Sequence, residues 1–379
     1  MAAVLAAPTG AHAGPQPLTL GTALPDTGSL KAYGPATQAA VRLAVEEANA
    51  AGGVMGAPVA LRPGDSGGTG SRTFARTLAA MPDAQAIVGP LSSTLVLDNI
   101  DAIEGRTVIS PAAVSPALTG VIARTVPAEP LAGAALATIA KQRGALRLVV
   151  VGPRQQRDLI DAALDRAGEL RMAATPVMYT KRQSAANIAT RTVRASADAM
   201  VLASASDTTA ILRELIRRGM PAIVLLAPSA ASGVVPRDLP KGTLDSAQTI
   251  DLDLRVPRSL ASQIRAIAPE APETAYSAQA YDAAAIAILA AEASSALTGE
   301  ITAAGVRAAL PSVTAVGQSC ETLGKCLRLL RQGVDIDYVG YVGPYDLDTA
   351  GDPGAARYLV RTYGTNNKPG TTARPIAYP

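Results

Sequence analysis

Residues 18–62 read LTLGTALPDTGSLKAYGPATQAAVRLAVEEANAAGGVMGAPVALR and contain a complete β-α-β unit. The apolar run Leu18–Leu24 is a candidate buried strand. Gly34-Pro35 opens a helix, because proline suits a first helical position, where its missing N–H has no partner to lose. Apolar residues then recur at helical spacing until Gly52-Gly53, which ends the helix. A second strand is expected near Val59–Arg62.

The same pattern continues along the chain and predicts the fold class. Expected strands are 86–88, 107–110, 146–151, 199–203 and 222–226; expected helices are 71–80, a segment after Ser92-Ser93, 131–143, 156–167, 186–196, 208–218, 258–267, 276–297 and 303–310. Such alternation predicts parallel sheets with right-handed crossovers. The alternation of strands and helices restarts after Pro127, and a chain of 379 residues is longer than a domain with a single hydrophobic core usually is. Two α/β domains are therefore expected. Residues 335–363 look like edge strands and crossing segments.

Composition narrows the possible ligands. The formal net charge is +3, and the Lys and Arg residues form no run interleaved with aromatics, so nucleic acid is not an expected partner. The chain has no Trp and one Phe, so any aromatic stacking in a ligand site depends on its 10 Tyr.

The N-terminus and the cysteines indicate export. Residues 1–13 are small and apolar and end in Ala11-His12-Ala13, which resembles a signal-peptidase site, although a basic segment is missing. We interpret them as a shortened signal peptide, with a disordered remnant as the alternative. In an exported protein, Cys320 and Cys326 suit a local disulfide; free buried thiols are the alternative. No zinc-type spacing is present, so no metal site is expected.

An enzyme is not expected. The single histidine, His12, lies in the segment assigned to the signal peptide, so the mature chain would have no imidazole for Ser-His or Cys-His catalysis. Residues 64–70 are Gly-rich but lack the Lys-Ser/Thr of a P-loop and the order of a dinucleotide motif, so they are better interpreted as a loop. No catalytic residue or cofactor is predicted.

Four motifs in sequence order resemble those of leucine/isoleucine/valine-binding proteins, the type I solute-binding proteins of branched-chain amino-acid ABC importers. They are LPDTGS at 24–29, AVEEANAAGGV at 44–54, VGPLSST at 88–94 and ISPAAVSPALT at 109–119. The resemblance covers about 18–365. It implies two Rossmann-like lobes with parallel sheets, joined by three crossing strands and closing on a ligand. Residues 18–126 and 251–338 would form lobe one, 127–250 and 339–365 lobe two, and 366–379 a tail.

The expected site lies beyond the carboxyl ends of the strands, where open α/β sheets bind ligands. Ser92, Ser93 and Thr94 begin a helix there, and its first N–H groups favour a carboxylate, although the serines could simply cap their own helix. The resemblance adds Ala112, Ala113 and Val114 around the ligand. It also places the ring of Tyr33 against the ligand, unless that ring packs on the surface.

The sequence departs from the family on lobe two. Where relatives have an acid for the ligand's ammonium, this chain has Ser229, and an unpaired buried ammonium is costly. Asp282, which follows Tyr281, is a candidate replacement for this acid, and both residues are candidate ligand contacts; the alternative is that Asp282 is a polar group at the lobe surface. We therefore expect a monomeric, extracytoplasmic solute-binding protein that presents a polar or carboxylate-bearing molecule without a free ammonium to an ABC permease. A sensing domain for a receptor or kinase is the alternative.

Overall fold

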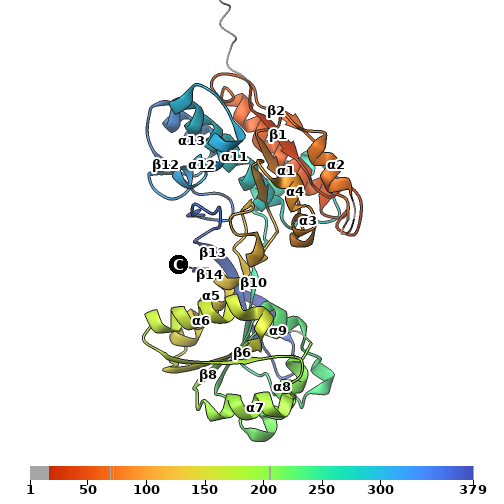
Figure 1. The fold of residues 1–379 in the computed structure, drawn as a ribbon, viewed down its shortest axis with the longest axis vertical. Coiled ribbons are helices and arrows are strands. Elements are labelled where there is room, and N and C mark those ends of the chain that lie inside the picture. The colour runs from red at the N-terminus through yellow and green to blue at the C-terminus, as the bar shows by residue number, and fades with distance from the viewer. Residues whose placement is uncertain (1–16, 69, 71, 205, 379) are drawn as a thin grey trace, which may run out of the picture.

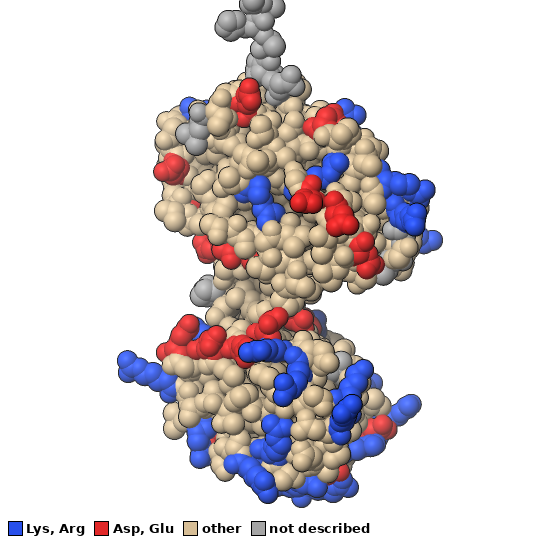
Figure 2. Space-filling model, in the orientation of Figure 1, with Lys and Arg blue, Asp and Glu red and all other residues tan. Residues whose placement is uncertain are grey.

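The computed structural model describes residues 17–68, 70, 72–204 and 206–378. The segment 1–13 that the sequence indicates as a signal peptide, with His12, lies outside the described residues. Two α/β lobes are stacked along the long axis of the molecule (Figure 1). They are joined by a waist that is much narrower than either lobe in the space-filling view (Figure 2).

Lobe one contains a parallel five-stranded sheet in the order β2-β1-β3-β4-β5. The strands are β1 (Thr19–Thr22), β2 (Ala60–Arg62), β3 (Ala86–Val88), β4 (Val108–Ser110) and β5 (Ala123–Arg124). Its helices are α1 (Gly34–Ala50), α2 (Thr73–Ala79), α3 (Ser93–Leu97), α4 (Ile100–Ile103), α10 (Arg258–Ile267), α11 (Ser277–Thr298), α12 (Ala303–Ala309) and α13 (Leu323–Arg331). A short parallel pair, β11 (Gln318–Cys320) and β12 (Ile336–Tyr338), completes the lobe.

Lobe two contains a seven-stranded sheet in the order β14-β13-β10-β9-β8-β6-β7. The strands are β6 (Arg147–Pro153), β7 (Ala173–Tyr179), β8 (Ala199–Leu202), β9 (Ile223–Leu226), β10 (Gln248–Leu252), β13 (Ala356–Tyr363) and β14 (Pro369–Tyr378). The last two run antiparallel to their neighbours. The helices are α5 (Glu129–Gln142), α6 (Arg157–Glu169), α7 (Ala185–Arg194), α8 (Thr208–Arg218) and α9 (Pro228–Ser232).

The expected α/β class with parallel sheets is confirmed, and many elements begin and end near their predicted limits. The packing of α1 on α11 explains why both helices are so rich in alanine: small side chains let two helices approach closely. Along α11, residues 283–291 are all fully buried, so this apolar stretch is a core helix. Among the described residues, no helix is both long and apolar enough to span a membrane.

Two segments differ from the expected lobe boundaries. Tyr345 and Leu347 pack in the core of lobe one, so the chain re-enters lobe two only at β13 rather than at residue 339. Residues 369–378, expected as a tail, form β14 and pair with β13 from Ala356↔Tyr378 to Tyr363↔Pro369. The reason is that β13 leaves a free hydrogen-bonding edge, which a returning strand satisfies.

Candidate ligand-binding site

The carboxyl ends of β1, β3 and β4 lie side by side, because these strands are neighbours in one parallel sheet. The loops that follow them hold Tyr33, the segment Ser92–Thr94 and the segment Ala112–Val114. The two segments are in direct contact, since the Ser115 N–H donates to Ser93 Oγ at 3.2 Å. The fold therefore brings together most of the lobe-one residues that the sequence predicted for the site.

The two serines at the start of α3 have different roles. Ser92 is the N-cap, with φ −140° and ψ 123°, and its Oγ accepts the N–H of Leu95 at 3.3 Å. The capping interpretation thus holds for Ser92. Among the described residues, the N–H groups of Ser93 and Thr94 have no protein acceptor. Both point from the first turn of a helix, where an anionic oxygen is a favourable acceptor.

The loop after β4 is held by Ser110. Its Oγ donates to the carbonyl of Pro90 at 2.6 Å and accepts the N–H groups of Ala112 and Ala113 at 3.3 and 3.0 Å. Ala113 is fully buried, so neither its side chain nor its amide is available to a ligand. This corrects the expectation for Ala113. Within the described chain, the Val114 N–H has no protein acceptor, so it is the free donor of this loop.

Arg124, at the end of β5, holds the loop that follows β4 in place. Its side chain is fully buried, and Nη1 donates to the carbonyls of Ala113 and Ser115 at 3.1 and 3.0 Å. These two carbonyls flank Val114. Holding them inward orients the intervening peptide, so Arg124 is a positioning residue that sequence reasoning missed.

Tyr33 is half-buried immediately before α1. Its ring meets that of Tyr276, the residue before α11, edge to face with centroids 5.7 Å apart. Tyr276 has φ 66°, in the left-handed region that a tyrosine seldom adopts. The aromatic pair lies where the first turns of α1 and α11 converge, and Tyr33 keeps an edge that a ligand could contact.

On lobe two, the segments after β6 and β9 carry polar side-chain atoms without partners. Ser229 lies in the first turn of α9, and its buried Oγ has no hydrogen-bond partner in the described structure; the same holds for the buried Oε1 of Gln156, in the turn after β6. Buried polar atoms are normally hydrogen-bonded. Orphaned ones at the carboxyl ends of strands are therefore candidates for ligand contact.

A second lobe-two group was missed from the sequence. The Tyr179 hydroxyl, at the end of β7, donates to Ser204 Oγ at 2.8 Å. Burial raises the pKa of Tyr179 to about 12, the Ser204 bond lowers it, and the adjacent Asp207 carboxylate raises it again. Asp207 is half-buried before α8 and caps nothing with its side chain. Asp207 is an acidic group near the carboxyl end of β8. The sequence signal that could have identified it as a site candidate is its position as an Asp after a strand.

Tyr281 and Asp282 do not belong to the ligand site. Asp282 is fully buried and accepts hydrogen bonds from the Tyr338 and Tyr345 hydroxyls (2.9 and 2.7 Å) and from the N–H groups of Tyr341 and Val342 (3.0 and 3.1 Å). Burial raises its pKa to about 6, although the four hydrogen bonds lower it. Tyr281 is 3% exposed and its hydroxyl donates to Glu47. Three segments connect the lobes: 125–128, 253–257 and 339–355. Asp282 instead anchors the third connection to lobe one.

A pocket of about 540 Å³ lies beside the second and third connections and is lined by Asp253, Arg255, Val256, Pro257, Arg258, Tyr341, Val342 and Arg357. Asp253 accepts two hydrogen bonds of 2.7 Å from Arg255 and lies 3.8 Å from Arg357. The Asp253 carboxylate therefore partly neutralises the positive charge of two of the three arginines that line the pocket. None of the residues predicted for the site lines this pocket.

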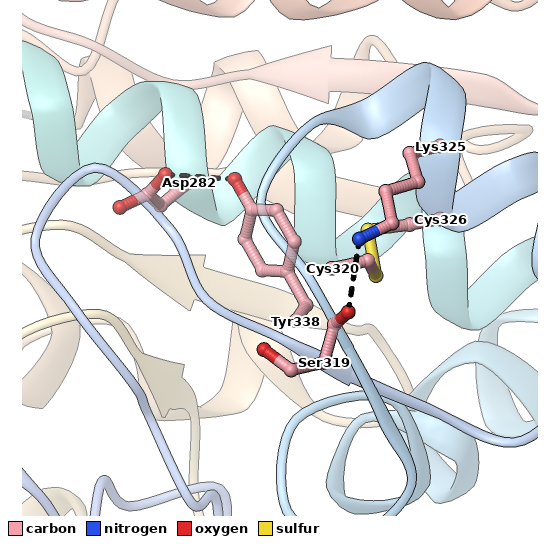
Figure 3. The surroundings of a disulfide bond; sticks show 6 residues. All are labelled: Asp282, Ser319, Cys320, Lys325, Cys326 and Tyr338. Carbon is pink, nitrogen blue, oxygen red and sulfur yellow. Dashed lines mark hydrogen bonds between the residues drawn. A yellow bond between two sulfur atoms is a disulfide. The ribbon is translucent and has the colours of Figure 1, made fainter.

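The predicted disulfide is present. Cys320 and Cys326 are bonded, with Cα atoms 5.5 Å apart, and link the end of β11 to α13 (Figure 3). Cys320 pairs with Tyr338 across β11 and β12, and Tyr338 in turn contacts Asp282. Among the described residues, no group of three or more His, Cys, Asp or Glu side chains is arranged to hold a metal ion.

A two-lobed fold with unsatisfied donors at the facing strand ends defines a solute-binding protein. The sequence model of the periplasmic binding protein family matches residues 17–324. The chain belongs to this family, which confirms the resemblance drawn from the four motifs.

The individual proteins that resemble this chain share less than 30% of its residues. The chemotactic signal transduction system substrate-binding protein BasB of Halobacterium salinarum is 29% identical, over 91% of this chain and 87% of its own. The leucine-binding protein of Thermotoga maritima is 18% identical, with a TM-score of 0.54 over 95% of this chain and 97% of its own. An R. palustris solute-binding protein of an ABC transporter, in complex with 4-hydroxybenzoate, is 14% identical, with a TM-score of 0.56 over 95% and 97%. The two structures bear on the fold alone.

Proposed function

We propose that this protein is an exported solute-binding protein of an ABC importer, and that it captures a carboxylate-bearing small molecule between its lobes. The observation that carries the proposal is the group of three backbone donors, from Ser93, Thr94 and Val114, for which the described residues supply no acceptor. An unsatisfied N–H is costly when it is removed from water, so closure of the lobes requires an acceptor to enter with them. A ligand carboxylate supplies one.

The donor role can be tested at residue 93, because Ser92 has the extended backbone that a following proline requires. Ser93→Pro removes the N–H at a helix position that tolerates proline. Ser93→Ala is the matched control: it loses the same hydroxyl, and the same bond from Ser115, but keeps the N–H. We expect the proline variant to bind the ligand at least about tenfold more weakly than the alanine variant. Equal affinities would mean that this amide does not bind the ligand.

The ligand is proposed to lack a free ammonium, because Ser229 and Gln156, whose buried side-chain oxygens have no partner in the described structure and lie just after strands of lobe two, carry no charge. A thermal-shift screen should compare amino acids with carboxylates of matched shape, such as leucine with 4-methylpentanoate, followed by calorimetric titration. Tight binding of leucine would contradict the proposal that the ligand lacks an ammonium. In that case, weaker leucine binding by Asp207→Asn would show that Asp207 pairs with the ammonium.

Capture is proposed to occur by hinge closure. A ligand that contacts both lobes only when they approach favours the closed state by its differential affinity. Small-angle scattering measures this directly, as a smaller radius of gyration when the ligand identified in the screen is present. An unchanged radius with saturating ligand would show that binding does not close the lobes.

Ligand sensing is the second candidate function, and the chemotaxis relative from H. salinarum is the observation that favours it. In that case the closed protein would contact a transducer rather than a permease. Deletion of the gene distinguishes the two functions. An importer component is required for uptake of the labelled ligand, whereas a sensor is required for the behavioural or transcriptional response with uptake intact.

A further inference from the structure

The two lobes carry opposite net charges. Residues 127–252 and 356–379, which form lobe two, contain 20 Lys and Arg against 11 Asp and Glu, a net charge of +9. Residues 17–126 and 253–355, which form lobe one, contain 14 against 20, a net charge of −6. The overall charge of +3 therefore conceals a strongly polarised molecule.

More than half of the excess positive charge of lobe two lies in one segment of the chain. The segment 180–241, which includes α7 and α8, holds nine basic and four acidic residues. These helices pack against each other at the end of the molecule farthest from lobe one (Figure 1). Lys and Arg side chains gather over this end in the space-filling view (Figure 2). We call this surface, formed by residues 180–241, the basic end.

Part of this charge is neutralised within the basic end. Glu214 pairs with Arg217 and Arg218, while Asp238 pairs with Arg213. By contrast, Lys181, Arg182 and Arg194 are exposed, and in the described structure no carboxylate forms an ion pair with them. These three cations, at the two ends of α7, are available to a partner.

We infer that the basic end docks on the anionic phospholipid headgroups of the membrane beside which an importer works. Protein interfaces have an apolar, charge-depleted centre. On the basic end, the large apolar side chains that are exposed are only Ile216 (38%) and Val235 (37%), among the residues described. Dispersed cations without an apolar centre fit a diffuse layer of negative charge, which attracts each nearby Lys or Arg. The acidic lobe one would be repelled, so the molecule would dock end-on.

The test is co-sedimentation of the full chain with vesicles. Phosphatidylcholine vesicles with and without about 30% phosphatidylglycerol are compared at low and high salt, since binding through surface charge weakens as salt screens it. We expect binding to the anionic vesicles at low salt and its loss at high salt. The variant K181E/R182E/R194E should bind at least about tenfold more weakly.

The matched control, R72E/R265E/R328E, reverses three exposed cations of lobe one for which the described part of the chain provides no ion pair. It has the same net charge as the lobe-two variant but keeps the basic end, so we expect it to bind like the natural protein. Circular dichroism melts check that both variants fold. Equal losses in the two variants would show that net charge alone governs binding and would overturn the proposal. The proposal would also be overturned if the natural protein did not bind anionic vesicles at low salt. That result is expected if the basic end binds an acidic protein partner instead.

Discussion

Nε of Arg124 lies 2.6 Å from Oδ1 of Asp352, and this ion pair joins the end of β5 in lobe one to the third connection between the lobes. Arg124 is fully buried, while Asp352 is 14% exposed. The same guanidinium holds the carbonyls on either side of Val114. If the third connection moves when the lobes close, the movement would therefore also shift the loop that contains the Val114 amide.

Asp352→Asn should destabilise the protein by about 3 kcal/mol, because it removes the counter-charge that forms the ion pair with the buried Arg124. It should also weaken ligand binding, since the loop around Val114 loses its brace. Urea unfolding and calorimetric titration measure the two effects. Asp346→Asn is the control: this exposed carboxylate lies on the same connection, forms no ion pair among the described residues, and has φ 46°, which asparagine tolerates. Equal effects of both substitutions would exclude the ion pair as the cause.

Stability should depend on pH through Asp282. Its folded pKa, about 6, lies above the ordinary value of 3.8. The folded state therefore binds the proton more tightly than the unfolded state, and its stability falls as pH rises from about 4 to about 6 and then levels off. The loss should reach up to about 3 kcal/mol. Asp282→Asn should lack this fall, so the difference in unfolding free energy between the two proteins should change over this range. Parallel pH profiles for the two proteins would contradict the assignment.

Much of the fold could be predicted from the sequence because its signals are local. The limits of α8 and α10 follow from apolar spacing within a few residues, and α1 is framed by Pro35 and Gly52. The missed strand β14 has no such pattern, since all ten of its residues are half-buried or exposed, and its partner edge is formed only in the tertiary structure.

The site was less predictable, because its geometry depends on distant residues. Ser93 could be proposed from its position after a strand, whereas Val114 was proposed only from the family resemblance. Asp282 was mistaken for a ligand contact because its donors lie 56 to 63 residues away, and nothing next to it in sequence announces them. The occupation of the Ala113 amide by Ser110 likewise depends on a turn that composition does not specify.

Gly340→Ala should destabilise the third connection. A Cβ at residue 340 would lie 2.5 Å from Cγ of Asp282, a distance that real contacts do not reach, so either the carboxylate or the connection must move. We expect a loss of about 2–4 kcal/mol in unfolding free energy, as for other overpacked sites that also break buried hydrogen bonds. Gly168→Ala is the control. Beyond its own helix, no atom among the described residues lies within 4 Å of a Cβ added at residue 168, which is in α6, where alanine is favoured, so this substitution should stabilise the protein by about 0.5–1 kcal/mol. A harmless Gly340→Ala would mean that the connection is not held tightly against Asp282.

Loss of the disulfide should cost about 2 kcal/mol, because Cys320 and Cys326 close a loop with a sequence separation of only 6, and short loops restrict the unfolded chain modestly. The double variant Cys320→Ser, Cys326→Ser and the reduced natural protein should show similar losses in thermal unfolding, and the variant should not respond to reductant. Ligand affinity should be nearly unchanged, since the bond braces β11 and α13 rather than the loops around Ser93 and Val114. A large loss of affinity would instead indicate that the bond stabilises the site through Tyr338 and Asp282, the contact next to it.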